Sequence, residues 1–311
     1  MTALPAVEVE ALSRVFGTGA ARRTVLDEVS FQVPRGEVLG VLGANGAGKT
    51  TLIKILATLL APSSGTARVA GSDVQTRPKA VRRRTAVVLG GDRGLYPRLS
   101  ARDNLLFFGM LSGLGRNTLT ARAGVLLTRM GLDDAADRRV ETFSKGMRQR
   151  LHLAAGLIAE PEVLLLDEPT IGLDPEEAAR LRETIRTLAG AGTTILLTSH
   201  YLLDIDRMTD RVLMLKDGRI THDLATADFR RLAGHVATAT ARGIGPLPEL
   251  PASLSTARTR HDPAGWQIDI PLPTWDPRLL ADIGSAFADL GPHTFDVRPV
   301  ALDDVFSLVA A

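Results

Sequence analysis

The stretch that decides the fold is EVLGVLGANGAGKTTLIKILATLL, residues 37–60. A short apolar run at 38–42 predicts a buried strand, and the apolar-periodic segment that opens at Lys49 and Thr50 and ends at Pro62 predicts a helix. Three glycines lie in the loop between them: Gly43, Gly46 and Gly48. Strand, glycine-rich loop and helix form the context in which the pattern G-x-x-x-x-G-K-[ST] binds phosphate, because backbone N–H groups and the positive end of a helix dipole converge there.

The chemistry of this loop predicts a nucleoside triphosphate as the ligand. Lys49 places a positive charge near the outer phosphates, and the Thr50 hydroxyl is a suitable ligand for Mg²⁺. A chance glycine-rich turn is the alternative, but it leaves the flanking strand and helix unexplained. The residues expected to bind the nucleotide here are Gly43, Asn45, Gly46, Ala47, Gly48, Lys49, Thr50 and Thr51.

Composition limits the class of protein. At 311 residues the chain is long enough for about two domains. It contains 45% hydrophobic residues and no cysteine, so a disulfide framework and a zinc–thiolate site are excluded and a reducing compartment is expected. No apolar run approaches the ~18–20 residues of a bilayer-spanning helix, and no signal peptide is expected at the N-terminus. The formal net charge of +2 is weak evidence for a nucleic-acid partner, and none is expected.

Two carboxylates follow a second apolar run. Residues 163–166 predict a buried strand that delivers Asp167 and Glu168 at its C-terminal end, where parallel α/β sheets bind their ligands. Neighbours on a strand point to opposite faces, so we expect different roles. Asp167 is expected to hold Mg²⁺ through water, and Glu168 to polarise the attacking water. An acidic pair that caps a helix is the alternative interpretation.

A histidine ends a third strand of the same kind. Residues 193–198 are rich in β-branched side chains and lead into Ser199 and His200. A lone histidine is usually a satisfied polar residue, but its place at the end of a strand in such a sheet favours a position facing the γ-phosphate.

The remaining elements of the first part of the chain follow from periodicity. Strands at 7–12 and 29–33 predict an antiparallel edge sheet beside the nucleotide core. Helical periodicity runs from 101 to 130, with a break at Gly113 and Gly115 and a capping-box-like start at Ser100 and Asp103. Two further features are expected, a helix from an N-cap at Ser144 to about 159 and a hairpin at 212–220.

Five motifs in order resemble those of the ATP-binding subunit of an ABC transporter, over about residues 5–225. GANGAGKT at 43–50 is similar to its Walker A motif, FSKGM at 143–147 to its signature motif, and LLLDE at 164–168 to its Walker B motif. IGLD at 171–174 resembles its D-loop and TSH at 198–200 its switch-histidine region. The form FSKGMRQR and the C-terminal VRPVALDDVF are similar to the branch of bacterial drug exporters of the daunorubicin-resistance type.

The resemblance implies an α/β fold: a P-loop NTPase core with an antiparallel edge sheet and an inserted helical subdomain at about 92–160. It implies ATP and Mg²⁺ as ligands, and a head-to-tail dimer, with a homodimer expected, in which Ser144 and Gly146 of one copy cap the ATP of the other. Phe16 would stack on adenine, although the sequence alone favours a core position for a single aromatic residue. Asp174 would communicate across the dimer, and His200 would hold the γ-phosphate.

The family also implies a transport function. A separate transmembrane permease would export a drug-like or hydrophobic cargo, with this chain peripheral at the cytoplasmic face of the membrane. A soluble ABC ATPase of DNA repair or translation is the alternative, but the chain has no long coiled-coil insertion and no zinc cysteines. A P-loop kinase or GTPase would leave the signature motif unexplained.

Two departures from the family pattern lie in the chain. Gly91, followed by Asp92, aligns where the family usually has a glutamine that touches Mg²⁺. Asp92 either replaces that ligand or caps the loop. In the signature motif, Lys145 and Met147 stand where glycine and glutamine are commonest.

The last residues predict a separate unit. We expect an ATP-binding domain at 1–230 and a small C-terminal α+β accessory domain at 231–311, without a catalytic constellation. Its expected elements are strands at 235–240, 253–258, 266–270 and 294–297 and helices at 277–290 and 302–309.

Overall fold

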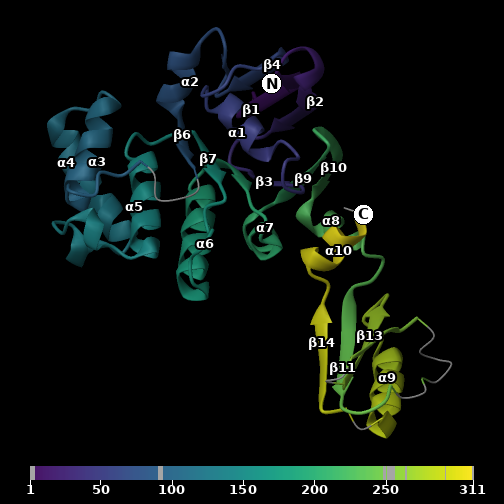
Figure 1. The fold of residues 1–311 in the computed structure, drawn as a ribbon. Coiled ribbons are helices and arrows are strands. Elements are labelled where there is room, and N and C mark those ends of the chain that lie inside the picture. The colour runs from purple at the N-terminus through teal and green to yellow at the C-terminus, as the bar shows by residue number, and fades with distance from the viewer. Residues whose placement is uncertain are drawn as a thin grey trace. The chain divides into compact units, whose positions relative to one another are not determined.

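The computed structural model describes residues 4–89, 94–247, 250, 256–262, 265–290 and 292–309. The chain forms two compact units, Met1–Thr226 and Ala227–Ala311, drawn in Figure 1. The boundary expected at residue 230 lies inside helix α8 (Thr226–Arg231). In the described parts of the chain, no helix is both long and apolar enough to cross a membrane.

The first unit is built on a six-stranded sheet in the order β10-β9-β3-β8-β7-β6. Neighbouring strands from β9 to β6 are parallel, and β10 pairs antiparallel with β9. Every residue of β3, β7 and β8 is buried, because helices and the second sheet cover a parallel sheet on both faces. The bounds are β3 Val38–Leu42, β6 Thr85–Val88, β7 Val163–Asp167, β8 Thr194–Thr198, β9 Arg211–Lys216 and β10 Arg219–Ala225.

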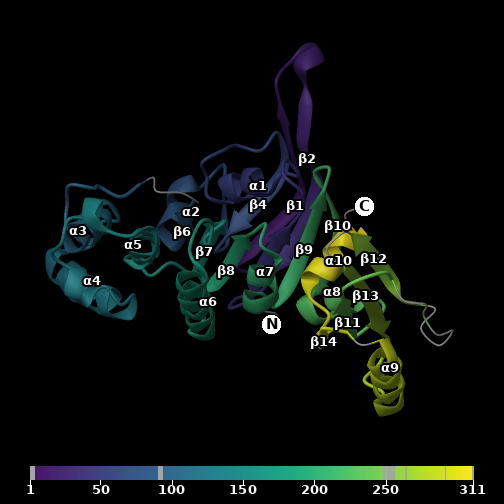
Figure 2. The same cartoon turned by 60° about the horizontal axis from the view of Figure 1, so that its bottom comes forward.

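A second, antiparallel sheet confirms the expected edge sheet. Its order is β2-β1-β4-β5, with bounds β1 Val7–Phe16, β2 Arg23–Val33, β4 Ser64–Val69 and β5 Ser72–Asp73. β1 and β2 extend beyond their predicted bounds and approach a 3₁₀ turn at Gly19–Ala21. Their added residues are mostly half-buried or exposed and lack the regular apolar alternation on which the prediction depended. Helix α1 (Lys49–Leu56), which lies beside β4 in Figure 2, packs against strands of both sheets. One apolar core joins the helix and the two sheets.

Helices complete the first unit. α3 (Ala101–Leu111) and α4 (Arg116–Arg129) are separated at the predicted break, and the Ser100 side chain accepts a hydrogen bond from the Asp103 N–H at 3.0 Å, as the capping box requires. α5 (Lys145–Leu157) packs on both and on β6. Together α3, α4 and α5 form the inserted helical subdomain. The remaining helices are α2 Pro78–Arg84, α6 Pro175–Gly190 and α7 Leu202–Met208.

The hairpin β9–β10 has the predicted turn. Asp217 and Gly218 have φ angles of 50° and 79°, which are those of a type I′ turn matched to the twist of the strands. Strand β10 then leads to α8.

The second unit is an α+β fold, as predicted. Its antiparallel sheet has the order β12-β13-β11-β14. Helix α9 covers one face, where Ile283 and Phe287 pack on Ala239, Ile268 and their neighbours. The other elements are β11 Ala237–Gly243, β12 Arg258–Asp262, β13 Gly265–Leu272, α9 Pro277–Leu290, β14 Thr294–Pro299 and α10 Leu302–Val309.

One strand of this unit was predicted wrongly. The sequence predicts a strand at 253–258, but β12 begins at Arg258, and residues 256–257 are not part of it. The serine- and threonine-rich run before it has local turn chemistry that imitates alternation. Residues 253–255 lie outside the described residues.

Candidate active site

The glycine-rich loop connects the carboxyl end of β3 to α1. Gly43, Gly46 and Gly48 have φ angles of 149°, 85° and 109°, which L side chains rarely adopt. A Cβ on Gly43 would lie 2.2 Å from the Leu215 carbonyl oxygen, and one on Gly48 would lie 2.7 Å from the Val25 carbonyl oxygen. Gly43 and Gly48 are therefore needed so that neighbouring strands can pack against the loop. This requirement adds to the need for open backbone where phosphate would approach.

Lys49 is buried beneath the loop, with 7% of the residue exposed. Its Nζ donates hydrogen bonds to the Gly43 carbonyl at 2.6 Å and the Ala44 carbonyl at 3.1 Å, which leaves one of its three donors for a ligand. Burial lowers the pKa of the Lys49 ammonium, and the Glu168 and Asp167 carboxylates oppose that shift. These two carboxylates therefore favour the charged form of Lys49.

Asp167 ends β7 and is buried. Its Oδ1 accepts hydrogen bonds from the Thr198 hydroxyl at 2.6 Å and the Thr50 hydroxyl at 3.2 Å. The structure therefore brings together Thr50 and Asp167, the two residues that the sequence assigned to Mg²⁺.

Glu168 differs from Asp167 for a reason that the sequence argument missed. β7 stops at Asp167, and Glu168 turns away with a left-handed φ of 51° instead of continuing the strand. Its N–H donates to the Thr198 carbonyl at 3.0 Å, and its Oε2 lies 3.0 Å from Nδ1 of His200. The two carboxylates are separated by this turn and not by the alternation of a strand.

A cavity of about 250 Å³ lies beside the loop. Its lining residues are Arg23, Val25, Asn45, Gly46, Gly48, Lys49, Thr50, Thr51 and Glu168. His200 reaches it through Glu168. No local pattern in the sequence predicts Arg23 and Val25 at this site, because nothing near either residue indicates that β2 passes the loop.

Five predicted binding residues do not line this cavity: Gly43 and Ala47, which belong to the loop itself, and Phe16, Ser144 and Gly146, which lie elsewhere. Phe16 ends β1 opposite Arg23, with its ring 39% exposed and the Arg14 guanidinium carbon 4.4 Å from the ring centre. Ser144 is the N-cap of α5, where its Oγ accepts from the Met147 N–H at 3.1 Å. Gly146 is buried beside Glu177 of α6. Gly91 and Asp92 lie outside the described residues, so the expectation for them stays a prediction.

Known proteins share these features. The model of the family described as "ABC transporter" matches residues 26–171. The daunorubicin/doxorubicin resistance ATP-binding protein DrrA of Streptomyces peucetius is 37% identical, over 97% of this chain and 91% of its own length. The chain belongs to the ABC transporter family. The doxorubicin resistance ATP-binding protein DrrA of Mycobacterium tuberculosis (strain H37Rv) is 36% identical to this ABC subunit, over 97% of this chain and 92% of its own length.

Solved structures agree with the fold. An ATP-binding subunit of an ABC transporter has 32% sequence identity and a TM-score of 0.64, over 73% of this ABC subunit and 93% of that chain. A dimeric ATP-binding cassette in a post-hydrolysis state, bound to ADP and Pi, has 22% identity and a TM-score of 0.64, over 71% and 98% of the two chains, and shows the fold alone. The prediction of a P-loop ATP-binding and ATP-hydrolysing subunit is confirmed, and the soluble DNA-repair or translation ATPase is not favoured.

Proposed function

We propose that this ABC subunit drives export of a drug-like or hydrophobic compound through a separate membrane permease, and that hydrolysis takes place at the carboxyl edge of its parallel sheet. The observation behind the proposal is the cluster of Lys49, Thr50, Asp167, Glu168 and His200, in which each residue is bonded or electrostatically coupled to another. The names of the relatives, which are resistance proteins for daunorubicin and doxorubicin, support the class of cargo.

The phosphates of ATP belong at the loop and Lys49. Gly46 points its hydrogen toward open space apart from the tip of Arg23, at 3.4 Å from an added Cβ, so phosphate oxygens can approach the backbone. Lys49 would use its remaining donor on the outer phosphates. Asn45, Ala47 and Thr51 complete the loop and the first turn of α1, where the helix dipole favours an anion.

The residues at the end of β7 fit Mg²⁺. Thr50 and Asp167 offer hard oxygen donors 3.2 Å apart, the type of ligand that this ion prefers. Among the described residues, no three acidic, histidine or cysteine side chains converge on a metal position, so phosphate oxygens and water must complete the coordination. Bound there, Mg²⁺ would neutralise charge that develops on the phosphates.

Glu168 is placed to act as the general base. Its carboxylate lines the cavity and would accept a proton from the water that attacks the γ-phosphorus, while the bond to the β–γ bridging oxygen breaks. His200 lies within hydrogen-bond distance of the same carboxylate and holds its orientation, so that Nε2 of the imidazole stays available for the γ-phosphate.

The working unit is a head-to-tail dimer. Ser144 and Gly146 do not line the cavity of their own chain, so they are free to cap ATP bound by a second copy. The N-terminal end of α5, a helix of 13 residues, offers N–H donors and a positive dipole end for that purpose. The exposed ring of Phe16 has one face toward Arg14, and the other face would stack on adenine.

The membrane part of the system is a separate subunit. We place this chain at the cytoplasmic face, held there by the permease, and we assign no nucleic-acid partner. The unit that begins at Ala227 would support assembly of the dimer or its regulation.

The test uses Glu168→Gln, which keeps the size of the side chain and removes the base. We expect ATP binding to persist while hydrolysis slows by about 10²–10⁴-fold. In gel filtration with ATP and Mg²⁺, the variant should then accumulate as a dimer. Parent-like turnover in Glu168→Gln would contradict the assignment, and a parent protein without ATP hydrolysis would contradict the proposed function itself.

A further inference from the structure

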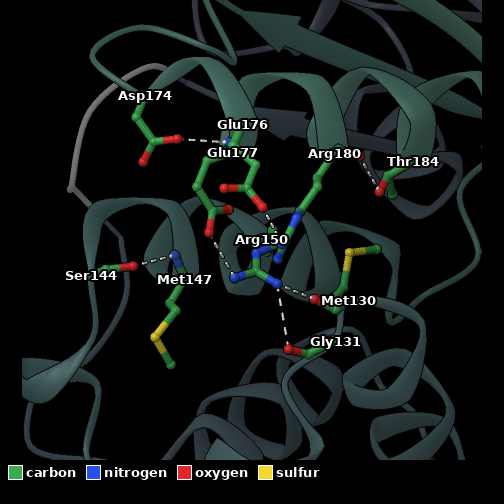
Figure 3. A network of polar contacts seen from close by, with 10 residues as sticks. All are labelled: Met130, Gly131, Ser144, Met147, Arg150, Asp174, Glu176, Glu177, Arg180 and Thr184. Carbon is green, nitrogen blue, oxygen red and sulfur yellow. Dashed lines mark hydrogen bonds and ion pairs between the residues drawn. The ribbon is translucent and has the colours of Figure 1, made fainter.

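The middle of α5 and the first turn of α6 are joined by a charged pair (Figure 3). Arg150 Nη2 lies 3.3 Å from Glu177 Oε1. Ser144, the N-cap of α5, belongs to the signature motif, and Asp174, the N-cap of α6, belongs to the D-loop motif. Asp174 accepts a hydrogen bond from the Glu177 N–H at 2.9 Å. The backbone of Glu177 is thus bonded to the D-loop motif, and its side chain is bonded to α5, the helix that begins in the signature motif.

Burial distinguishes this pair from the exposed Arg180–Glu176 ion pair on the same helix. The side chains of Arg150 and Glu177 are 12% and 20% exposed, whereas those of Arg180 and Glu176 are 56% and 76% exposed. Exposed pairs contribute little because water and salt screen them, but removal of one partner from a buried pair leaves a charge without compensation. Glu177 and Glu176 are thus neighbouring residues of α6 in a buried and an exposed ion pair, so substitution of Glu176 is a control for substitution of Glu177.

Glu177 also lies directly on the signature backbone. A Cβ added to Gly146 would be 2.6 Å from Cδ of Glu177 and 2.7 Å from its Oε2. All the close atoms belong to the Glu177 side chain, and Gly146 has an ordinary helical φ. A side chain at 146 would therefore have to displace the Glu177 carboxylate from its place beside Arg150.

A second contact joins the same two segments. The Lys145 side chain lies against Gly172: a Cβ added to Gly172 would be 2.1 Å from Nζ of Lys145. Lys145 is one of the departures from the commonest signature form, so this contact is a property of this chain.

Arg150 reaches a third helix as well. Its Nη1 donates to the Met130 carbonyl at 2.9 Å and to the Gly131 carbonyl at 3.4 Å, just after α4 ends. A cation at a helix C-terminus is favoured by the dipole and by unpaired carbonyls. One guanidinium thus links α4, α5 and α6.

We propose that Arg150 and Glu177 are positioning residues that hold the signature motif and Asp174 in one fixed arrangement, so that both meet the ATP of the partner copy together. Arg150 also neutralises the Glu177 carboxylate, which would otherwise repel a phosphate near Gly146. The inference rests on the proposed dimeric function and deepens it.

The first experiment compares turnover in Arg150→Met, Glu177→Gln and the double variant, with Glu176→Gln as the exposed control. Arg150→Met should lower kcat by about 10–100-fold, because an unpaired carboxylate then faces the phosphate, and adding Glu177→Gln should recover part of that loss. Glu176→Gln should match the parent.

A readout separates positioning from simple structural damage. ATP binding to the monomer, measured as a Kd, should be unchanged in Arg150→Met, while the ATP-dependent dimer of the Glu168→Gln background should need at least about 10-fold more ATP to form. If Kd and dimer formation weaken together, or if neither changes, the positioning role is overturned.

A second experiment needs no activity. Gly146→Ala should lower the thermal midpoint because its Cβ displaces Glu177, so the same substitution should lower the midpoint much less in a Glu177→Ala background, and as much as in the parent in a Glu176→Ala background. If Gly146→Ala lowers the thermal midpoint equally with and without Glu177, the inferred contact between the Glu177 carboxylate and Gly146 is wrong. A parent without ATP turnover would refute the proposed function, while this thermal test would still decide the contact.

Discussion

The six-stranded sheet and the C-terminal sheet of this ABC subunit use polar side chains in opposite ways. At the carboxyl edge of the six-stranded sheet, polar groups from β7, β8 and α1 converge on one point, where Thr50 and Thr198 both donate to Asp167. On the face of the C-terminal sheet opposite α9, polar groups are spread along the strands and paired across them. There Thr240 donates to Asp269 at 2.7 Å, and Arg242 donates to Gln267 at 3.0 Å.

The difference follows from strand direction. Parallel strands end at the same edge, so the residues after them collect there with donors and acceptors to spare for a ligand. Antiparallel neighbours place side chains opposite one another along their length, and cross-strand pairs satisfy the polar groups. Convergence at an edge is therefore evidence for chemistry, while a paired polar face is evidence for a surface.

Lys49→Ala should have the largest effect, because it removes the cation at the edge of the parallel sheet. We expect ATP binding to weaken by about 10²–10³-fold, since a phosphate charge would lose its buried partner. Titration of the purified variant with ATP measures this. Arg242→Ala on the C-terminal sheet is the control and should bind as the parent does; near-normal binding by Lys49→Ala would break the comparison.

Substitution of one glycine in each of the two units should have the next largest effect, a loss of stability of that unit. Gly43→Ala should destabilise the first unit by about 2–5 kcal/mol, because it combines an unfavourable φ with a clash against the Leu215 carbonyl. Gly243→Ala should cost the second unit about 1–3 kcal/mol, because the new Cβ would lie 2.2 Å from Cζ2 of Trp266.

Fluorescence can assign each loss to its unit. The chain has two tryptophans, Trp266 and Trp275, and both belong to the unit that begins at Ala227. The thermal transition of tryptophan emission should move in Gly243→Ala, and ATP binding should be lost only in Gly43→Ala. If Gly243→Ala also abolished ATP binding, the polar sheet would not be independent of the nucleotide site.

Removal of the C-terminal unit should have the smallest effect on the nucleotide. A chain that ends at Thr226 should bind ATP with a Kd within about twofold of the parent, because the described residues that line the cavity all precede it. Isothermal titration gives the value. Loss of binding on truncation would make the second unit part of the catalytic core.

Local chemistry explains what could be predicted from the sequence. The strand at 38–42, the Ser100 cap, the Asp217–Gly218 turn and α9 each depend on neighbours within a few positions, and the structure has them where the patterns indicate. The pairing of Thr50 with Asp167 was also predicted, because two separate motifs each implied Mg²⁺.

Tertiary contacts explain what could not. Arg150 and Glu177 are 27 positions apart, and nothing near either residue indicates that α5 and α6 lie side by side. Arg23 reaches the loop only because β2 passes over it. The left-handed turn at Glu168 is imposed by Thr198 of the neighbouring strand, so a pattern along β7 alone could not show it.

That turn has a consequence for protein engineering. A non-glycine residue at φ 51° costs about 1–2 kcal/mol, and asparagine tolerates this conformation better than glutamate does. A library screened only for heat resistance would therefore favour replacement of Glu168 and select proteins that lack the proposed general base. A selection for more thermostable variants of this ABC subunit must therefore also measure ATP turnover, because we expect stability and activity to conflict at this residue.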